Sequence, residues 1–408
     1  MKASKGDVPV VVAAVRTPIG RAGKGSFTEL RGDDLAALAV RAALDRVPQI
    51  NPAQVEDLIL GCAQPAAEQG FNIARVVSLL AGLGDVPGTT VNRYCASSLQ
   101  AVRMAAHAIV AGEGECFIAA GTEACSRFGK GNADRVPDTK NPRFDGAQAR
   151  SAARAEAVGE SWAPAPGLPD IYIAMGQTAE NVAQSKGVTR EEMDAFALLS
   201  QERAVAAQAR GFFDAEIVPV TTAAGTVVDR DDCPRSGTTL ERLGQLKPVF
   251  RSDGSVTAGN SCPLNDGGAA AIITSTSFAE RHELRPIARI LATGLSALNP
   301  EIMGLGPVQA CRNAMRLAGM TIDDIDLVEM NEAFAAQVIP SAAELGIGYE
   351  KLNVNGGAIA LGHPFGMTGV RILTTLLNSL RDRDQTIGME TMCVGGGQGM
   401  ALIVERLN

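Results

Sequence analysis

The chain has 408 residues, enough for two or three core-forming units, and 46% of them are apolar, so we expect a globular protein. Its net charge of −8, without any basic block, argues against nucleic acid as a partner. No run approaches the ~18 uncharged apolar residues of a membrane span, so no membrane partner is expected. No signal peptide or peroxisomal SKL address is recognisable, which predicts a cytoplasmic protein.

The eight cysteines are scattered along the chain, at positions 62, 95, 116, 125, 233, 262, 311 and 393. No two of them have C-x-x-C spacing, so neither a zinc site nor a redox motif is indicated, and we predict no bound metal. In cytoplasm these thiols should stay reduced.

Strands and helices alternate in the first third of the chain, which favours a layered α/β domain. Strands are predicted at 10–15, 58–60 and 116–120, and helices at 72–81 and at 33–47, where Asp33 or Asp34 would be the cap.

The middle of the chain differs, because residues 127–170 contain many Gly, Pro, Asp, Asn and Arg residues and no sustained apolar period. Helices are predicted at 175–185 and 190–209, followed by a polar loop at 229–243. This region is typical of an insertion packed on the α/β body, where ligand contacts often lie.

A second α/β series follows, with a strand at 269–274 leading into it. Strands are predicted at 287–291 and 327–329, a helix at 307–318, a strand, glycine-rich turn and helix over 352–380, and strands at 386–394 and 400–405. The elements match those of the first series in order, for instance LILGC with LVEMN, so a duplicated half is the simplest interpretation.

The stretch 91–110, VNRYCASSLQAVRMAAHAIV, predicts a strand, a sharp turn and a helix. Ser97 and Ser98 are good N-cap residues, and Gly112 is a typical C-terminal stop. Cys95 would lie at the helix N-terminus, where the helix dipole and unpaired N–H groups favour a thiolate. The alternative is a small buried side chain, the usual role of a free cysteine.

Three polar residues in the second series follow predicted strands or enter glycine-rich turns. His363 lies in the counterpart of the Cys95 turn, although it could simply bond loop carbonyls. Cys393 precedes GGGQG, whose N–H groups could bind an oxyanion or form only a tight hairpin. Asn331 could hold a water or close an Asx-turn. Together they predict a site between two duplicated halves.

The motifs NRYCASS, MGQTAENVA, NEAFAAQ, GGAIALGHPFGMTG and CVGGGQG occur in this order and resemble those of thiolases, the acyl-CoA C-acyltransferases. GTEACS and TAGNSCPLNDG are similar too. The resemblance implies a thiolase fold: two α/β halves with mixed five-stranded sheets in a layered αβαβα arrangement. It divides the chain into an N-terminal half (1–123 and 259–284), an inserted loop domain (124–258) and a C-terminal half (285–408).

By the same resemblance, Cys95 would be the acylated nucleophile and His363 its activating base. Cys393 would be the second acid/base, acting on the acetyl Cα. Asn331 would hold a water that forms one oxyanion hole with His363 Nε2, and the N–H groups of Cys95 and Gly395 would form the other. Coenzyme A would be a co-substrate, with no permanently bound cofactor and no metal.

The resemblance also implies residues that contact the acyl-CoA: Met175, Arg235, Ala258, Cys262 and Phe334. Two departures from short-chain biosynthetic members, Ala96-Ser97-Ser98 after the nucleophile and Ala174 before Met175, leave room for a bulkier acyl group. We therefore expect a degradative 3-ketoacyl-CoA thiolase, of fatty-acid or steroid degradation, that forms a homodimer or homotetramer. The alternatives are acetoacetyl-CoA synthesis, a ketosynthase, or a non-catalytic lipid-carrier relative.

Overall fold

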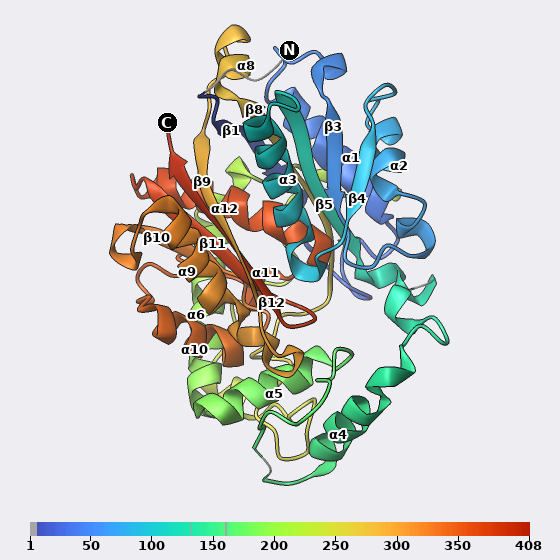
Figure 1. Cartoon of the computed structure of the whole chain (residues 1–408), viewed down its shortest axis with the longest axis vertical. Helices are drawn as coiled ribbons and strands as arrows, with labels where there is room; N and C mark the ends of the chain where they lie inside the picture. Colours follow the sequence, from blue (N-terminus) through green and yellow to red (C-terminus); the bar gives the residue numbers. More distant parts are fainter. Residues whose placement is uncertain (1–5, 131, 160) are drawn as a thin grey trace.

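The computed structural model describes residues 6–130, 132–159 and 161–408, and in this part of the chain one ten-stranded mixed sheet is the main feature (Figure 1). Its strands are β1 (Pro9–Arg16), β2 (Gly20–Arg21), β3 (Asp57–Gly61), β4 (Gly88–Val91), β5 (Cys116–Ala124), β8 (Asn265–Ser275), β9 (Ala288–Ala297), β10 (Leu327–Met330), β11 (Ile387–Val394) and β12 (Gln398–Arg406).

The sheet consists of two halves with matching strand order. The N-terminal half runs β4-β3-β5-β8-β1, and β2 pairs with β8. The C-terminal half runs β10-β11-β12-β9, and a single parallel bridge from Val328 to Leu352 stands where β4 stands in the first half. The halves join where β1 pairs with β9 over two residues, Val10 and Val11. This matching order supports the predicted duplication.

Helices cover both faces of each half, which is why β5 and β8 are buried along their whole length. The outer layers are α1 (Gly32–Asp45) and α2 (Ile73–Leu80) on one side, and α9 (Gly306–Ala318) and α10 (Ala335–Leu345) on the other. The middle layer is α3 (Ser97–Ala111) and α12 (Thr368–Asp382), which contact each other and both halves of the sheet (Figure 1). The expected αβαβα layering is therefore present.

The two central helices approach closely at their N-terminal ends. A Cβ atom added to Gly369 would lie 2.3 Å from the Leu99 nitrogen, so only glycine fits there. One residue further on, the Val370 N–H donates to Ser98 Oγ at 3.0 Å. This contact fixes the start of α3 against the start of α12.

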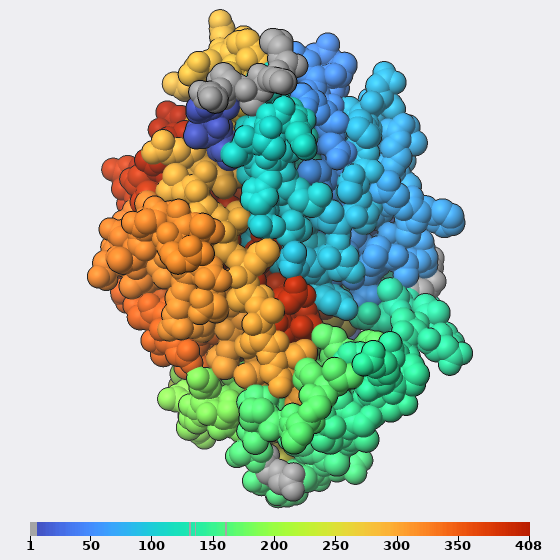
Figure 2. All heavy atoms as spheres, in the orientation of Figure 1, coloured from blue at the N-terminus to red at the C-terminus, as the bar shows by residue number. Residues whose placement is uncertain are grey.

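The middle of the chain forms one end of the molecule, below both halves in Figure 2. It contains α4 (Asp145–Glu156), α5 (Met175–Lys186), α6 (Arg190–Ala209) and α7 (Leu240–Gly244). The small hairpin of β6 (Val220–Thr221) and β7 (Val227–Val228) instead packs on the N-terminal half, against Phe27 and Leu35. Glu301, from the C-terminal half, anchors the middle of the chain by accepting from Trp162 Nε1 at 2.7 Å and from the Asp170 N–H at 3.0 Å. The short helices α8 (Thr276–Arg281) and α11 (Ala358–Leu361) complete the structure.

Several local predictions are wrong, mostly at helix starts. Neither Asp33 nor Asp34 caps α1, which begins after Arg31, because the Asp33 carboxylate instead binds the Arg31 guanidinium. Ser97 and Ser98 do not cap α3, because their hydroxyl groups bond the preceding turn and α12.

Other differences concern whole elements. The strand expected to begin the 352–380 segment is reduced to the Leu352 bridge. Helices α4, α7 and α10 were not predicted, and α10 carries Pro340 inside it. No helix in the described residues combines the length and apolarity needed to cross a membrane.

We predict that Gly369→Ala lowers the free energy of unfolding by roughly 1–3 kcal/mol, because the added methyl group would overpack the contact with α3. The matched control is Gly244→Ala at the end of α7, where an added Cβ meets no atom within 4 Å. Urea unfolding of both variants measures the difference. Equal midpoints would contradict the importance of this contact.

Candidate functional site

Cys95 lies in a strained turn between β4 and α3. The turn is one 3₁₀ segment, Tyr94–Ala96, and Tyr94 has a φ of 41°, which is uncommon for a residue other than glycine. The Tyr94 N–H donates to Asn92 Oδ1 at 2.8 Å, and Ser97 Oγ donates to the Tyr94 carbonyl at 2.6 Å. These bonds present the half-buried Cys95 thiol at the start of the helix.

The glycine turn between β11 and β12 meets this thiol. The N–H groups of Gly395 and of Cys95 itself face Cys95 Sγ and act to lower the pKa of this thiol. Gly397 must be glycine, because its φ is 76° and an added Cβ would lie 2.3 Å from the Leu298 carbonyl oxygen. Arg93 joins the two turns by donating from Nη1 to Gln398 Oε1 at 2.8 Å.

His363 is held on three sides just before α12. Its backbone N–H donates to Asn265 Oδ1 at 2.8 Å. Its Nδ1 lies 2.6 Å from Thr368 Oγ1, and that hydroxyl donates to the Pro364 carbonyl at 2.8 Å. Its Nε2 lies 3.2 Å from Asn331 Nδ2.

Asn331 follows β10 directly, as the sequence predicts, and its side chain is fully enclosed by protein. The Asn331 carbonyl accepts from Gln337 Nε2 at 2.8 Å, which fixes the residue against α10. Asn331 Oδ1 is buried and bonds no other described atom. The amide can therefore bind a further polar group beside the imidazole.

Three thiols, those of Cys95, Cys262 and Cys393, lie close enough to interact electrostatically. Cys393 is buried near the end of β11, two residues before Gly395. Cys262 is placed by its N–H, which donates to the Ala333 carbonyl at 3.1 Å. The structure thus brings Cys95, Cys393 and Gly395 together.

Burial sets the charge state of the nucleophile and the base. It raises the pKa of the Cys95 thiol to about 12, against the opposing effect of the two N–H groups. It lowers the pKa of His363 to about 3, and the Arg371 guanidinium lowers it further. Desolvation therefore favours the neutral form of both groups in the unliganded protein, and it opposes the effect of the helix dipole, which favours a thiolate at Cys95.

Two buried carboxylates position the loops of the site, and neither is among the site residues that the sequence predicts. Glu123, near the end of β5, accepts from the N–H groups of Gly366 at 3.0 Å and Ala63 at 2.9 Å. Glu332 accepts from the Ile359 N–H at 3.1 Å. A sequence pattern could have identified them, because each is a charged residue within or just after a buried strand: Glu123 in GTEACS and Glu332 in NEAFAAQ.

The residues expected to contact an acyl-CoA are less closely grouped. Phe334 is buried and forms an isolated antiparallel β-bridge with Ser261, the residue that precedes Cys262. Met175, at the start of α5, packs in the same apolar cluster as Phe334. Ala258 and Arg235 are exposed. The hydrogen bonds seen for Arg235 among the described residues involve its backbone: its N–H donates to Gln201 Oε1 at 2.8 Å, and its carbonyl accepts from Thr238 Oγ1 at 3.0 Å and from the Thr238 N–H at 3.3 Å.

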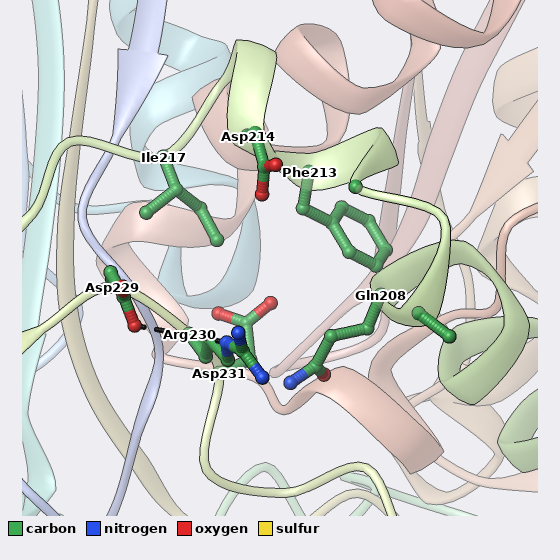
Figure 3. A pocket seen from close by; sticks show the side chains of 9 residues that line it. Gln208, Phe213, Asp214, Ile217, Asp229, Arg230 and Asp231 are labelled. Atoms are coloured by element: carbon green, nitrogen blue, oxygen red, sulfur yellow. Dashed lines mark ion pairs between the residues drawn. The ribbon is translucent and has the colours of Figure 1, made fainter.

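A separate cavity of about 140 Å³ is lined by other residues (Figure 3). It is lined by Gln208, Ala209, Gly211, Phe213, Asp214, Ile217, Asp229, Arg230 and Asp231. It contains an exposed Asp229–Arg230 pair but no nucleophile beside a base. We therefore place the chemistry at Cys95 and His363.

We predict that the rate of Cys95 alkylation by iodoacetamide rises about tenfold per pH unit between about pH 6 and 10, because the thiol stays protonated below its raised pKa. Peptide-level mass spectrometry separates Cys95 from the other thiols, and glutathione is the reference. A rate that is flat below pH 7 would instead indicate a preformed thiolate–imidazolium pair.

Comparison with known proteins shows the family to which the chain belongs. The family model for the thiolase N-terminal domain matches residues 9–277, and that for the thiolase C-terminal domain matches residues 284–406.

Among relatives, a β-ketoadipyl-CoA thiolase of Acinetobacter baylyi is 44% identical over 97% of this chain and 99% of its own. A 3-ketoacyl-CoA thiolase of Bacillus subtilis is 42% identical over 97% and 98%. Solved structures of Bacillus anthracis acetyl-CoA acetyltransferase and human mitochondrial 3-ketoacyl-CoA thiolase both superpose with a TM-score of 0.85, at 37% and 36% identity, covering 98% of this chain and 99% of theirs. The chain belongs to the thiolase family and has the thiolase fold.

Proposed function

We propose that this thiolase is degradative and cleaves a 3-ketoacyl-CoA, with coenzyme A as co-substrate and no permanently bound cofactor. The observation that carries the proposal is the meeting of the loops that hold the reactive groups. The Cys95 and Cys393 thiols lie close enough to interact, beside the Gly395 N–H. The Tyr94–Ala96 turn that contains Cys95 contacts the Phe365–Met367 turn that follows His363, which is paired with Asn331. One thiol can form a thioester while the other transfers a proton to carbon.

Cleavage begins when His363 Nε2 takes the Cys95 proton and the thiolate attacks the 3-keto carbonyl carbon. Asn331, through a water, and His363 Nε2–H stabilise one oxyanion, and the N–H groups of Cys95 and Gly395 stabilise the other. When the Cα–Cβ bond breaks, the Cys393 thiol protonates the departing acetyl-CoA enolate.

The second half of the cycle restores both thiols. The Cys393 thiolate takes the proton of the coenzyme A thiol, whose sulfur attacks the acyl-Cys95 thioester. Cys95 leaves as a thiolate and regains its proton from His363. No net proton is gained or lost by the protein over the cycle.

We also propose that residues 1–123 with 259–284, and residues 285–408, form the two catalytic halves. The inserted loop domain over 124–258 is proposed to bind the acyl-CoA. Arg235, exposed at the surface of that region, is the proposed partner of the coenzyme A nucleotide. Met175 and Phe334, in one apolar cluster, are proposed to contact the acyl or pantetheine part, with Ala258 and Cys262 beside them.

We further propose that the protein is a cytoplasmic homodimer or homotetramer. The outer strand β4 leaves one edge of the sheet without a neighbouring strand in the described chain. Beside it Phe71 is 95% exposed, with Leu79 and Leu80 also exposed on α2. A second copy covering this edge would remove both features from water, and sedimentation as a monomer would contradict the assembly.

The substrate prediction is a higher kcat/KM for bulky 3-ketoacyl-CoA substrates than for acetoacetyl-CoA, because Ala174 presents only a methyl group at the start of α5. Coenzyme A-dependent cleavage should be measured with acetoacetyl, long linear, α-branched, ring-bearing and β-ketoadipyl substrates. A clear preference for acetoacetyl-CoA would favour the biosynthetic alternative.

The mechanism predicts different losses for the two cysteines. Cys95→Ala should abolish both cleavage and covalent labelling by acyl-CoA. Cys393→Ala should reduce cleavage by roughly 10²–10⁴-fold yet still accept an acyl group from a saturated acyl-CoA, because that step moves no carbon-bound proton. Intact-mass spectrometry reads the adducts. Adducts on Cys95→Ala, or full cleavage by Cys393→Ala, would show that the roles are misassigned.

A further inference from the structure

The hydroxyl group of Thr368 has two hydrogen-bond partners but only one proton to donate. It lies 2.8 Å from the Pro364 carbonyl oxygen and 2.6 Å from His363 Nδ1. A carbonyl oxygen can only accept, so the hydroxyl proton points at Pro364. The hydroxyl oxygen must then accept from His363, and the hydrogen atom on the imidazole lies on Nδ1.

We propose that Thr368 is a positioning residue that holds His363 in the Nδ1–H tautomer, so that the Nε2 lone pair faces the reacting groups. The inference rests on the proposed function, because it deepens the role of His363 as the base for Cys95. Thr368 would thus increase the rate of Cys95 acylation through His363, without touching the substrate itself.

The other side of the ring has the complementary arrangement. Asn331 Nδ2 lies 3.2 Å from His363 Nε2, and an amide nitrogen can only donate. Nε2 therefore accepts, which requires that it carries no proton. The two sides of the imidazole thus specify the same tautomer independently.

Thr368 can fix the ring only because its own position is fixed. It is fully buried and is the first residue of α12. The next two residues contact the start of α3: Gly369 lies against Leu99, and the Val370 N–H donates to Ser98 Oγ at 3.0 Å. The hydroxyl is therefore placed relative to the helix that begins beside Cys95.

A hydroxyl group orients the ring without adding charge. A carboxylate at the same place would stabilise an imidazolium and hold the proton on the histidine. With Thr368 the ring takes the Cys95 proton during attack on the carbonyl and keeps the Nδ1 hydrogen throughout, so Nε2 is the one atom that exchanges a proton with Cys95.

The chain offers a matched control for substitution. Thr374 lies six residues further along α12, is 1% exposed, and donates its hydroxyl to the Val370 carbonyl at 2.7 Å. Thr368 donates in the same way to the residue four positions before it, Pro364. The two threonines differ in that Thr368 also touches the imidazole.

The kinetic test measures the single-turnover rate at which a saturated acyl-CoA acylates Cys95. Thr368→Val should slow this step roughly 10- to 100-fold with little change in acyl-CoA affinity. Thr368→Ser should restore most of the rate, and Thr374→Val should leave it within about twofold of wild type. An equal loss in Thr368→Val and Thr374→Val, or no rescue by serine in a folded variant, would overturn the proposal.

A second measurement needs neither activity nor a Thr368 variant. The chain has three histidines, so ¹⁵N-histidine labelling of a His107→Gln/His282→Gln variant leaves only the His363 nitrogens. We expect Nδ1 with a protonated-type and Nε2 with an unprotonated-type chemical shift at pH 7, and the same variant should still cleave its substrate. The reverse pattern of chemical shifts would overturn the tautomer assignment even if the enzyme is a fully active thiolase. If the wild-type protein cleaves no 3-ketoacyl-CoA, the proposed function is overturned instead.

Discussion

The contact between the N-terminal ends of α3 and α12 is the constraint on which the site depends. The turn that contains Cys95 directly precedes α3, and the loop that contains His363 precedes α12. The 3₁₀ turns before the two helices contact each other directly. Because Gly369 has no side chain, backbone meets backbone at Leu99, and Ser98 adds a hydrogen bond across the contact. Small shifts of either helix would therefore move Cys95 relative to His363.

The groups expected to react differ in chemistry from the groups that hold the surrounding loops. Burial raises the pKa of the Cys95 thiol and lowers the pKa of the His363 imidazole, so it favours the neutral form of each. The loops nearby are instead held by the carboxylate groups of Glu123 and Glu332, which accept several backbone and side-chain donors. Burial raises the pKa of both carboxylic acids, and the hydrogen bonds oppose that rise. The carboxylates of Glu123 and Glu332 thus hold the loops by accepting from N–H donors. The thiols and the imidazole are the groups proposed to transfer protons.

Sequence patterns predicted most strands, the duplicated order and the turns that carry Cys95 and His363, because each of these depends on local periodicity and glycine placement. They failed where a distant partner decides the outcome. Ser98 reads as a helix cap, yet its hydroxyl bonds α12, a partner 272 residues away in sequence. Leu352 has strand character but finds only a one-residue bridge. The charge state of Cys95 also depends on how much protein surrounds it, which no local pattern records.

The duplicated fold explains how one site acquires two different reactive groups. In the N-terminal half β4, which pairs in parallel with β3, leads through a short 3₁₀ turn into the fifteen-residue helix α3. In the C-terminal half the segment that forms the parallel Val328–Leu352 bridge leads through α11 and a short 3₁₀ turn into the fifteen-residue helix α12. Packing these helices side by side in the middle layer brings their preceding loops to the same place. The first loop carries a thiol two residues before its helix begins, and the second carries an imidazole five residues before its helix begins. The two loops therefore supply a nucleophile and its base from matching places in the two halves. Neither half contains both groups, and therefore the reaction requires the interface between them.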